Sequence, residues 1–293
     1  MSERIKPQSR ERSTIDVFVP CIFDRIKAHD LAGVEHLIET GVDVNKKDEW
    51  GYAPLHWASN YSAMARLLIS RGADVNAKKL DGDTPLHLAC ANRCLEVVHL
   101  FLFYGADVNA VNDKRRTPLH EACEEGHSDI ARLLLEHGAD PNAMSTAGTA
   151  ALRQACMKGH VELTRLLLDY GADVNIKNQH GFTPLHGAAS ATSKGHADMI
   201  VLLLERGADI NAKNRFDSMP LHYACENSHA EIVRLLLDHG ADHHQKNYLG
   251  YTPLNYVVNL PPDDPAREQI IGLFSKYAPE AVMEAWCAGG PTR

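Results

Sequence analysis

Histidine is the residue type that most suggests chemistry in this chain, because 17 imidazoles could bind metal ions or transfer protons. Five of them recur at one position of a repeated tetrapeptide: His56, His87, His120, His186 and His222. His239, His243 and His244 form a separate local cluster. Gly240 interrupts this cluster, so His239 and His243 do not share one helix, and no carboxylate or cysteine completes a ligand set. We therefore expect an exposed loop here, and neither a metal ion nor another cofactor.

Cysteine is the second candidate, as a metal ligand or a redox-active thiol. Four of the 7 cysteines hold equivalent positions in successive copies of a repeat: Cys90, Cys123, Cys156 and Cys225. Neighbouring helices pack about 8–10 Å apart, whereas a disulfide needs Cα atoms within about 7 Å of each other. The four thiols are therefore predicted to fill the core as free thiols and not to cross-link or share a metal ion.

Aspartate and asparagine also recur once in each copy, as in Asp107-Val108-Asn109. Such pairs would suit calcium or acid–base catalysis, but short polar side chains that bond to nearby backbone are typical of tight turns. No nucleophile elbow, glycine-rich phosphate loop or paired CxxC set occurs outside the repeat. The sequence therefore predicts no catalytic residues and no enzymatic activity.

The composition narrows the class of protein. The chain has 293 residues, a formal net charge of −8 and a pI near 6.1, which disfavours nucleic acid as the main partner. No apolar run approaches the length of a membrane span, and the N-terminus lacks the apolar region of a signal peptide. We expect a cytoplasmic, monomeric protein that binds neither nucleic acid nor membranes.

The elements that position these residues follow from a repeat. One leucine returns at spacings of 31, 33, 33, 33, 36 and 33 residues: Leu55, Leu86, Leu119, Leu152, Leu185, Leu221 and Leu254. A threonine such as Thr84 can cap a helix N-terminus with its hydroxyl, and Pro85 then occupies the first helical position. A second helix follows and ends at a glycine such as Gly105. Each copy is therefore a pair of short helices and a polar turn.

The repeated motifs resemble those of the ankyrin-repeat family. The resemblance is carried by TPLH at 84–87, 117–120 and 183–186, GADVNA at 72–77 and 105–110, and GADVN at 171–175. It covers roughly Phe18 to Tyr277. It implies an all-α repeat solenoid, an ankyrin-type stack of helix-turn-helix units with β-hairpin-like fingers. It also implies that the recurrent histidine ties its own turn to the neighbouring finger by hydrogen bonds.

The repeat divides the chain into three predicted parts. Residues 1–17 are charged and nearly free of apolar side chains, so they are predicted to be a disordered arm. Residues 18–278 form the solenoid, with an N-terminal cap at 18–50, six internal repeats at 51–249 and a C-terminal cap at 250–278. Residues 279–293 are predicted to be a short helix and tail.

Three internal repeats depart from the pattern. The repeat at 51–81 lacks two residues, which predicts a trimmed first helix or turn. The repeat at 181–216 has three extra residues near 191–194. The repeat at 148–180 loses the cap, the proline and the histidine together, at Ala150, Ala151 and Arg153. We expect it to be the least stable, because a lost cap alone costs about 1 kcal/mol.

Variable positions on this constant scaffold are the candidate binding residues. In the family that the chain resembles, the fingertips and the residue after TPLH face the concave side of the stack. Aromatic residues are enriched in protein interfaces, and here they gather toward both ends, with charges between them. The predicted partner-binding residues are Trp50, Tyr52, Trp57, Lys114, Arg116, Glu121, Phe182, Phe216, Tyr223, Tyr251 and Tyr256. An alternative is that some rings cover the joints between fingers.

The predicted function is therefore a non-catalytic protein–protein interaction module, acting as an adaptor, scaffold or inhibitor through the concave surface. Two alternatives share the same fold. One is a substrate-recruiting subunit of an enzyme assembly, and the other is a secreted effector that acts in a host cell.

Overall fold

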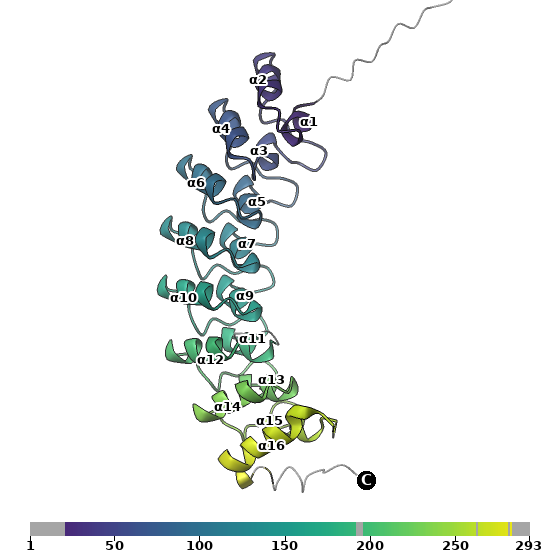
Figure 1. Ribbon diagram of the computed structural model, residues 1–293, viewed down its shortest axis with the longest axis vertical. Helices are drawn as coiled ribbons and strands as arrows, with labels where there is room; N and C mark the ends of the chain where they lie inside the picture. The colour runs from purple at the N-terminus through teal and green to yellow at the C-terminus, as the bar shows by residue number, and fades with distance from the viewer. Residues whose placement is uncertain (1–20, 192–195, 262, 281, 283–293) are drawn as a thin grey trace, which may run out of the picture.

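Sixteen α-helices make up the part of the chain that the computed structural model describes, which is residues 21–191, 196–261, 263–280 and 282. They follow one another in pairs that stack along the long axis of the molecule (Figure 1). The first helices of the pairs are α1 (Ile22–Lys27), α3 (Pro54–Trp57), α5 (Pro85–Ala91), α7 (Pro118–Glu125), α9 (Ala151–Lys158), α11 (Pro184–Ser190), α13 (Pro220–Glu226) and α15 (Pro253–Val258). The second helices are α2 (Leu31–Glu39), α4 (Ser62–Ser70), α6 (Leu95–Phe103), α8 (Ser128–Glu136), α10 (Val161–Asp169), α12 (His196–Glu205), α14 (Ala230–Asp238) and α16 (Pro265–Tyr277).

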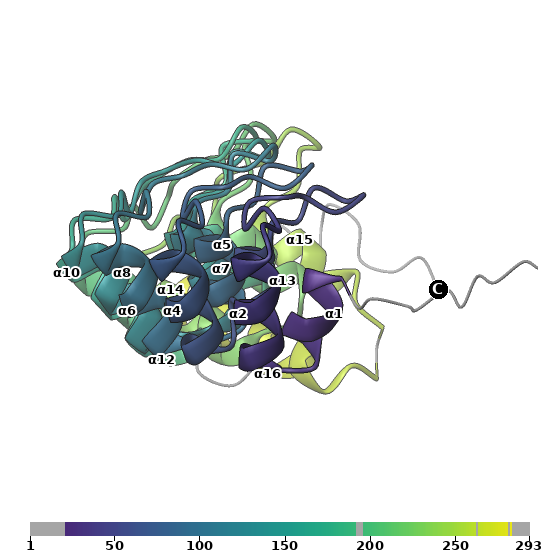
Figure 2. The same cartoon turned by 90° about the horizontal axis from the view of Figure 1, so that it is seen from above.

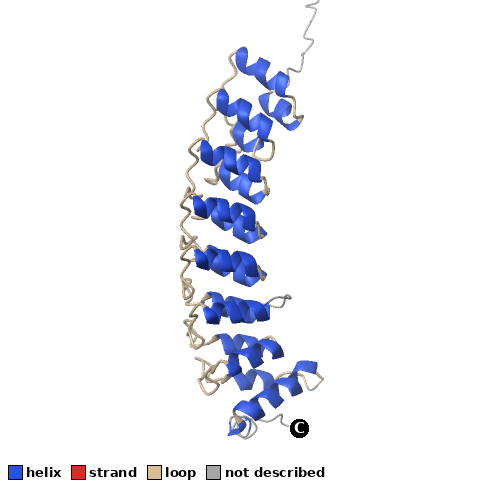
Figure 3. Ribbon diagram, turned by 60° about the vertical axis from the view of Figure 1, so that its left-hand side comes forward, coloured by secondary structure: helices blue, strands red, loops and turns tan. Residues whose placement is uncertain are grey.

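The loops between pairs all project on one side of the two helix layers (Figures 2 and 3). Each loop is a finger closed by a backbone hydrogen bond, such as the one of 3.1 Å from the Asn112 N–H to the Arg116 carbonyl. No extended strand occurs among the described residues; the fingers contain a single isolated bridge, between Met144 and Ala150. We call the surface lined by the fingers and the first helices the inner face.

Each helix pair is specified by local signals. In α8, Ile130, Leu133 and Leu134 lie on one buried face. The chain leaves the helix at Gly138, two residues after Glu136, where a φ of +86° is a conformation that glycine adopts without steric cost. Because every pair buries one stripe of each helix against its neighbours, a single continuous core runs along the stack.

The four aligned cysteines lie in this core, as predicted. Cys90, Cys123, Cys156 and Cys225 are fully buried and free. Burial raises the pKa of each thiol, to about 12 for Cys156. Cys21 and Cys94 are also free, and Cys287 lies outside the described residues.

The recurrent histidine joins consecutive repeats, which confirms the role expected from the resemblance. In α5, the Nδ1 of His87 accepts the Thr84 backbone N–H at 3.2 Å, and its Nε2 lies 3.0 Å from the Arg116 carbonyl of the next finger. Because a carbonyl can only accept, Nε2 carries the proton. Burial lowers the pKa of this histidine, and of its four equivalents. The imidazole is therefore a neutral bridge between repeats.

This arrangement corrects the predicted threonine cap. Only Thr183 accepts a backbone N–H with its hydroxyl, at a long 3.4 Å. The hydroxyls of Thr84 and Thr117 instead lie 2.9 Å from the histidine Nδ1 of their own turn. Since that Nδ1 is an acceptor, the threonine hydroxyl donates to it, and the histidine also accepts the backbone N–H of the same threonine.

Asparagine forms a second link between repeats, which the sequence reasoning had treated only as a turn residue. The Asn109 side chain donates to the Gly138 carbonyl at 3.0 Å and accepts the Asp140 N–H at 2.8 Å. Asp107 holds the turn itself, because its carboxylate accepts the Asn109 N–H. We call this recurrent link the asparagine ladder. Its members are Asn45, Asn76, Asn109, Asn142, Asn175 and Asn211.

The irregular repeats differ as their sequences suggest. Helix α3 has four residues where α5 has seven, as the missing residues at 51–81 predicted. In α9, Arg153 stands at the position of the bridging histidine without making its hydrogen bonds; its guanidinium lies 5.8 Å from the Phe182 ring centre, and its buried Nε has no hydrogen-bond partner. The predicted arm at 1–17, residues 192–194 of the insertion near 191–194, and residues 281 and 283–293 of the predicted C-terminal helix and tail lie outside the described residues.

Candidate protein-binding site

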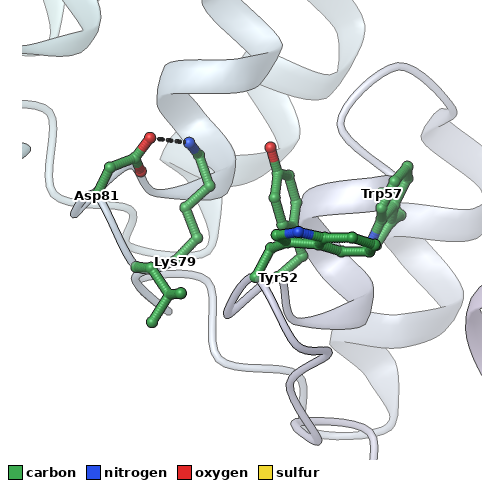
Figure 4. Close-up of a pocket in the computed structure, with 6 residues that line it drawn as sticks. Tyr52, Trp57, Lys79 and Asp81 are labelled. Atoms are coloured by element: carbon green, nitrogen blue, oxygen red, sulfur yellow. Dashed lines mark hydrogen bonds and ion pairs between the residues drawn. The ribbon is translucent and has the colours of Figure 1, made fainter.

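An aromatic pocket of about 450 Å³ opens on the inner face, between the first two fingers of the stack (Figure 4). Its walls combine two segments distant in sequence: Trp50, Tyr52 and Trp57 from the first finger and α3, and Lys79, Leu80 and Asp81 from the second finger. The rings of Tyr52 and Trp57 lie 5.2 Å apart. Trp50 is 56% exposed and Leu80 is 73% exposed, so the rim presents apolar surface to solvent. We call this site the aromatic pocket.

Asp48 holds the backbone of the first fingertip and the Trp57 ring in place. One carboxylate oxygen accepts the backbone N–H groups of Trp50 and Tyr52, at 3.0 and 2.9 Å. The other oxygen accepts the Trp57 indole N–H at 3.2 Å. The Leu80 N–H also donates to the Trp50 carbonyl, which joins the two fingertips. The fingertip backbone and the Trp57 ring are therefore preorganised, so a ligand would pay little entropy to order them.

Lys79 forms one side of the aromatic pocket and carries no free charge. Only 9% of its side chain is exposed, and its ammonium pairs with Asp81 and with Asp83. Burial opposes the charged form, but the hydrogen bonds to Asp81 and Asp83 raise the pKa of Lys79 above its usual value. Two carboxylates share this one cation, so the cluster of Lys79, Asp81 and Asp83 is negative overall.

A second hollow adjoins the aromatic pocket at Asp81 and spans the second and third fingers. It is lined by Asp81, Asp83, Asn112, Asp113, Lys114, Arg116, Glu121 and Glu124. Five carboxylates thus face two cations. Arg116 pairs with both Glu121, at 2.7 Å, and Glu124, at 2.6 Å. Although burial opposes it, the pairing with Glu121 and Glu124 raises the pKa of Arg116. We call this surface the acidic pocket.

The structure therefore changes how the predicted central residues would act. Lys114 is exposed at its fingertip, but Arg116 and Glu121 are bonded to each other and not free for a partner. The sequence analysis also missed Glu124, which lies one helical turn beyond Glu121. Its carboxylate adds to the negative charge of the acidic pocket.

The aromatic residues near the C-terminal end form pairs along the inner face. Phe182 lies 5.4 Å from Tyr223, and Tyr251 lies 5.8 Å from Tyr256. The hydroxyls of Tyr223 and Tyr256 accept hydrogen bonds from Asn214 and Asn247 at the bases of fingers. These two rings therefore also cover finger joints, as the alternative interpretation held.

One exposed ring in this region was missed. Tyr248 is 63% exposed and lies 5.5 Å from Phe216, the predicted residue at the preceding fingertip. An alignment of the fingers on their fingertip glycine would have identified Tyr248. It lies two residues before that glycine, the position that Leu80 holds in its own finger.

The comparisons with known proteins agree with this architecture. The family model described as ankyrin repeats (3 copies) matches residues 26–112, 79–145, 138–214 and 190–261. The chain belongs to the ankyrin-repeat family. It is similar in structure to the human ASB11 ankyrin repeat domain, with 28% sequence identity and a TM-score of 0.68 over 76% of this chain and 98% of that one. The comparison with curated proteins gave no match.

Ankyrin repeats are protein-interaction modules, so the class of function is protein binding. None of the helices in the described part of the chain is long and apolar enough to cross a membrane.

Proposed function

We propose that this protein is an adaptor, scaffold or inhibitor that binds a partner polypeptide along its inner face, with the aromatic pocket as the anchor. The observation that supports this most is the contiguity of an aromatic pocket and an acidic pocket, joined at Asp81. Interfaces concentrate their affinity in a few large apolar or arginine anchors. The aromatic pocket offers space for a bulky apolar side chain beside the packed rings of Tyr52 and Trp57.

The acidic pocket defines the second requirement on the partner. Its excess of carboxylates favours a lysine or arginine side chain on the partner. A cation placed there would face Asp113 and the carboxylates that share the cations of Lys79 and Arg116. An anionic segment would be repelled by the same groups.

The spacing of the two pockets favours one backbone conformation. Adjacent helix pairs pack about 8–10 Å apart. A polyproline II segment has three residues per turn and rises about 3.1 Å per residue, so residues i and i+3 share a face about 9 Å apart. The partner is therefore an extended segment with a large apolar residue and a basic residue three positions away.

A displayed library of random peptides, selected on the full chain, tests this proposal. Enriched peptides should contain the apolar residue and the basic residue at that spacing. Synthetic copies should bind Trp50→Ala at least tenfold more weakly, because loss of an aromatic anchor costs about 2 kcal/mol or more. Asp113→Asn should weaken binding less and reduce its dependence on salt.

Phe103→Ala is the matched control. Phe103 is 82% exposed but lies on α6, in the outer helix layer. Its removal should leave peptide binding unchanged. Peptides that bind Trp50→Ala normally but lose binding to Phe103→Ala would place the interface on the outer layer and refute the proposal.

A further inference from the structure

The asparagine ladder ends at the finger that begins at Gly240. In each earlier finger an apolar residue or proline precedes the ladder asparagine: Val44-Asn45, Val75-Asn76, Val108-Asn109, Pro141-Asn142, Val174-Asn175 and Ile210-Asn211. At the corresponding two positions of this finger the chain carries His243 and His244. The Asp242 N–H still bonds to Asn211, so the backbone of the finger is in register with the others. Only the two side chains differ.

A carboxylate from the C-terminal segment meets these two imidazoles. The Glu280 Oε1 lies 3.6 Å from the Nε2 of His243 and 3.5 Å from the Nε2 of His244. The two imidazole rings lie 4.1 Å apart. The Nε2 of His243 is buried and has no hydrogen-bond partner. The sequence-based expectation that no carboxylate completes this cluster is therefore wrong.

The distances suit a metal ion better than direct hydrogen bonds. A charge-assisted N–H···O bond would bring the atoms to about 2.7–2.9 Å. In a tetrahedral zinc site, Zn–N and Zn–O distances of about 2.0–2.2 Å place neighbouring ligand atoms about 3.3–3.5 Å apart. The two measured N···O separations lie close to that value.

The exposure of the cluster also suits a ligand site. Side-chain exposures of 53% for His244 and 55% for Glu280 leave an open path for an ion.

We propose that His243, His244 and Glu280 form a zinc site that fastens the C-terminal segment to the last finger of the ladder. Two imidazole nitrogens and one carboxylate oxygen are a donor set that zinc prefers, and water would complete the tetrahedron. The bound ion would take over the inter-element link that an asparagine makes in every earlier finger.

Zinc titration of the full, tag-free and chelator-treated chain tests this proposal. Calorimetry should give one equivalent of bound zinc, and cobalt should give the visible absorption of a tetrahedral complex. His243→Val with His244→Asn restores the pair found at Val108-Asn109 and should preserve the fold. It should weaken zinc binding at least tenfold, because even the loss of groups outside the ligand shell costs about 10–100-fold in affinity. Zinc should raise the melting temperature of the parent chain but not of this variant.

Two further variants make the test specific. Glu280→Gln should also weaken binding at least tenfold. His239→Asn is the control, because the Nδ1 of His239 already bonds to the Leu235 carbonyl within its own helix. Unchanged zinc affinity in His243→Val/His244→Asn would overturn the site, as would less than one equivalent on the parent chain. Unchanged affinity in Glu280→Gln would exclude the three-ligand arrangement.

Discussion

The repeat at 148–180 allows a quantitative test of how consecutive repeats are joined. In the repeats on either side, His120 and His186 reach a carbonyl of the following finger at 3.0 Å. In α9 the Arg153 side chain makes no such bond. The triple change Ala150→Thr, Ala151→Pro and Arg153→His should restore it, with the Phe182 carbonyl as the acceptor.

The expected gain follows from the contacts. The introduced imidazole would make one hydrogen bond within its turn and one to the next finger, each worth about 1 kcal/mol. Proline at a compatible position adds about 0.5 kcal/mol, and loss of the Arg153–Phe182 contact subtracts a similar amount. We therefore expect stabilisation by about 2 kcal/mol and a rise of a few degrees in melting temperature.

Urea denaturation followed by circular dichroism measures the global effect, and amide hydrogen exchange in α9 and α10 measures the local one. The reverse change in the preceding repeat, Thr117→Ala, Pro118→Ala and His120→Arg, is the matched control. It should destabilise the chain by a similar amount. An unchanged or lowered midpoint in the restored chain, with the control destabilised as expected, would refute the reasoning, because it would show that Arg153 already replaces the histidine bridge.

Three further predictions concern pH, thiols and the asparagine ladder. Burial lowers the pKa of His186 to about 4. On acidification, the histidine of the unfolded chain, with a pKa of about 6.5, takes up its proton at a higher pH than His186 of the folded chain. The contribution of His186 to the free energy of unfolding is therefore fully present above about pH 6.5. It falls by about 3 kcal/mol by pH 4. A flat urea midpoint between pH 7 and 4.5 would contradict this. With a thiol reagent, exposed Cys21 should react in the native protein, whereas buried Cys123 should react only as fast as the chain unfolds. Asn109→Ala should cost about 1 kcal/mol in urea unfolding, because it removes two solvent-exposed inter-finger hydrogen bonds, each worth about 0.5 kcal/mol. An unchanged midpoint would mean that water replaces them fully.

The helix pairs could be predicted because their signals are local. Proline at the first helical position, apolar spacing of three and four residues, and a glycine with positive φ each act within one turn. The repeat period then implied the stack, and the recurrence of each histidine, cysteine and asparagine indicated a structural role. The threonine hydroxyl was assigned to the wrong partner, because it can either accept a backbone N–H or donate to the histidine Nδ1, and only geometry decides between the two.

The sequence by itself determined the architecture. It also determined which side chains occupy equivalent positions in successive repeats, because a repeat places equivalent residues at equivalent points. Only the tertiary structure decided the pairings between residues far apart in the chain. It brought Leu80 beside Trp50, gathered Asp81, Asp83 and Asp113 around one hollow, and placed Glu280 against His243. The aromatic pocket, the negative balance beside it and the proposed zinc site all arise from such pairings. Their physical origin is the packing of one repeat on the next, which sets side-chain directions and charge compensation that no local signal encodes.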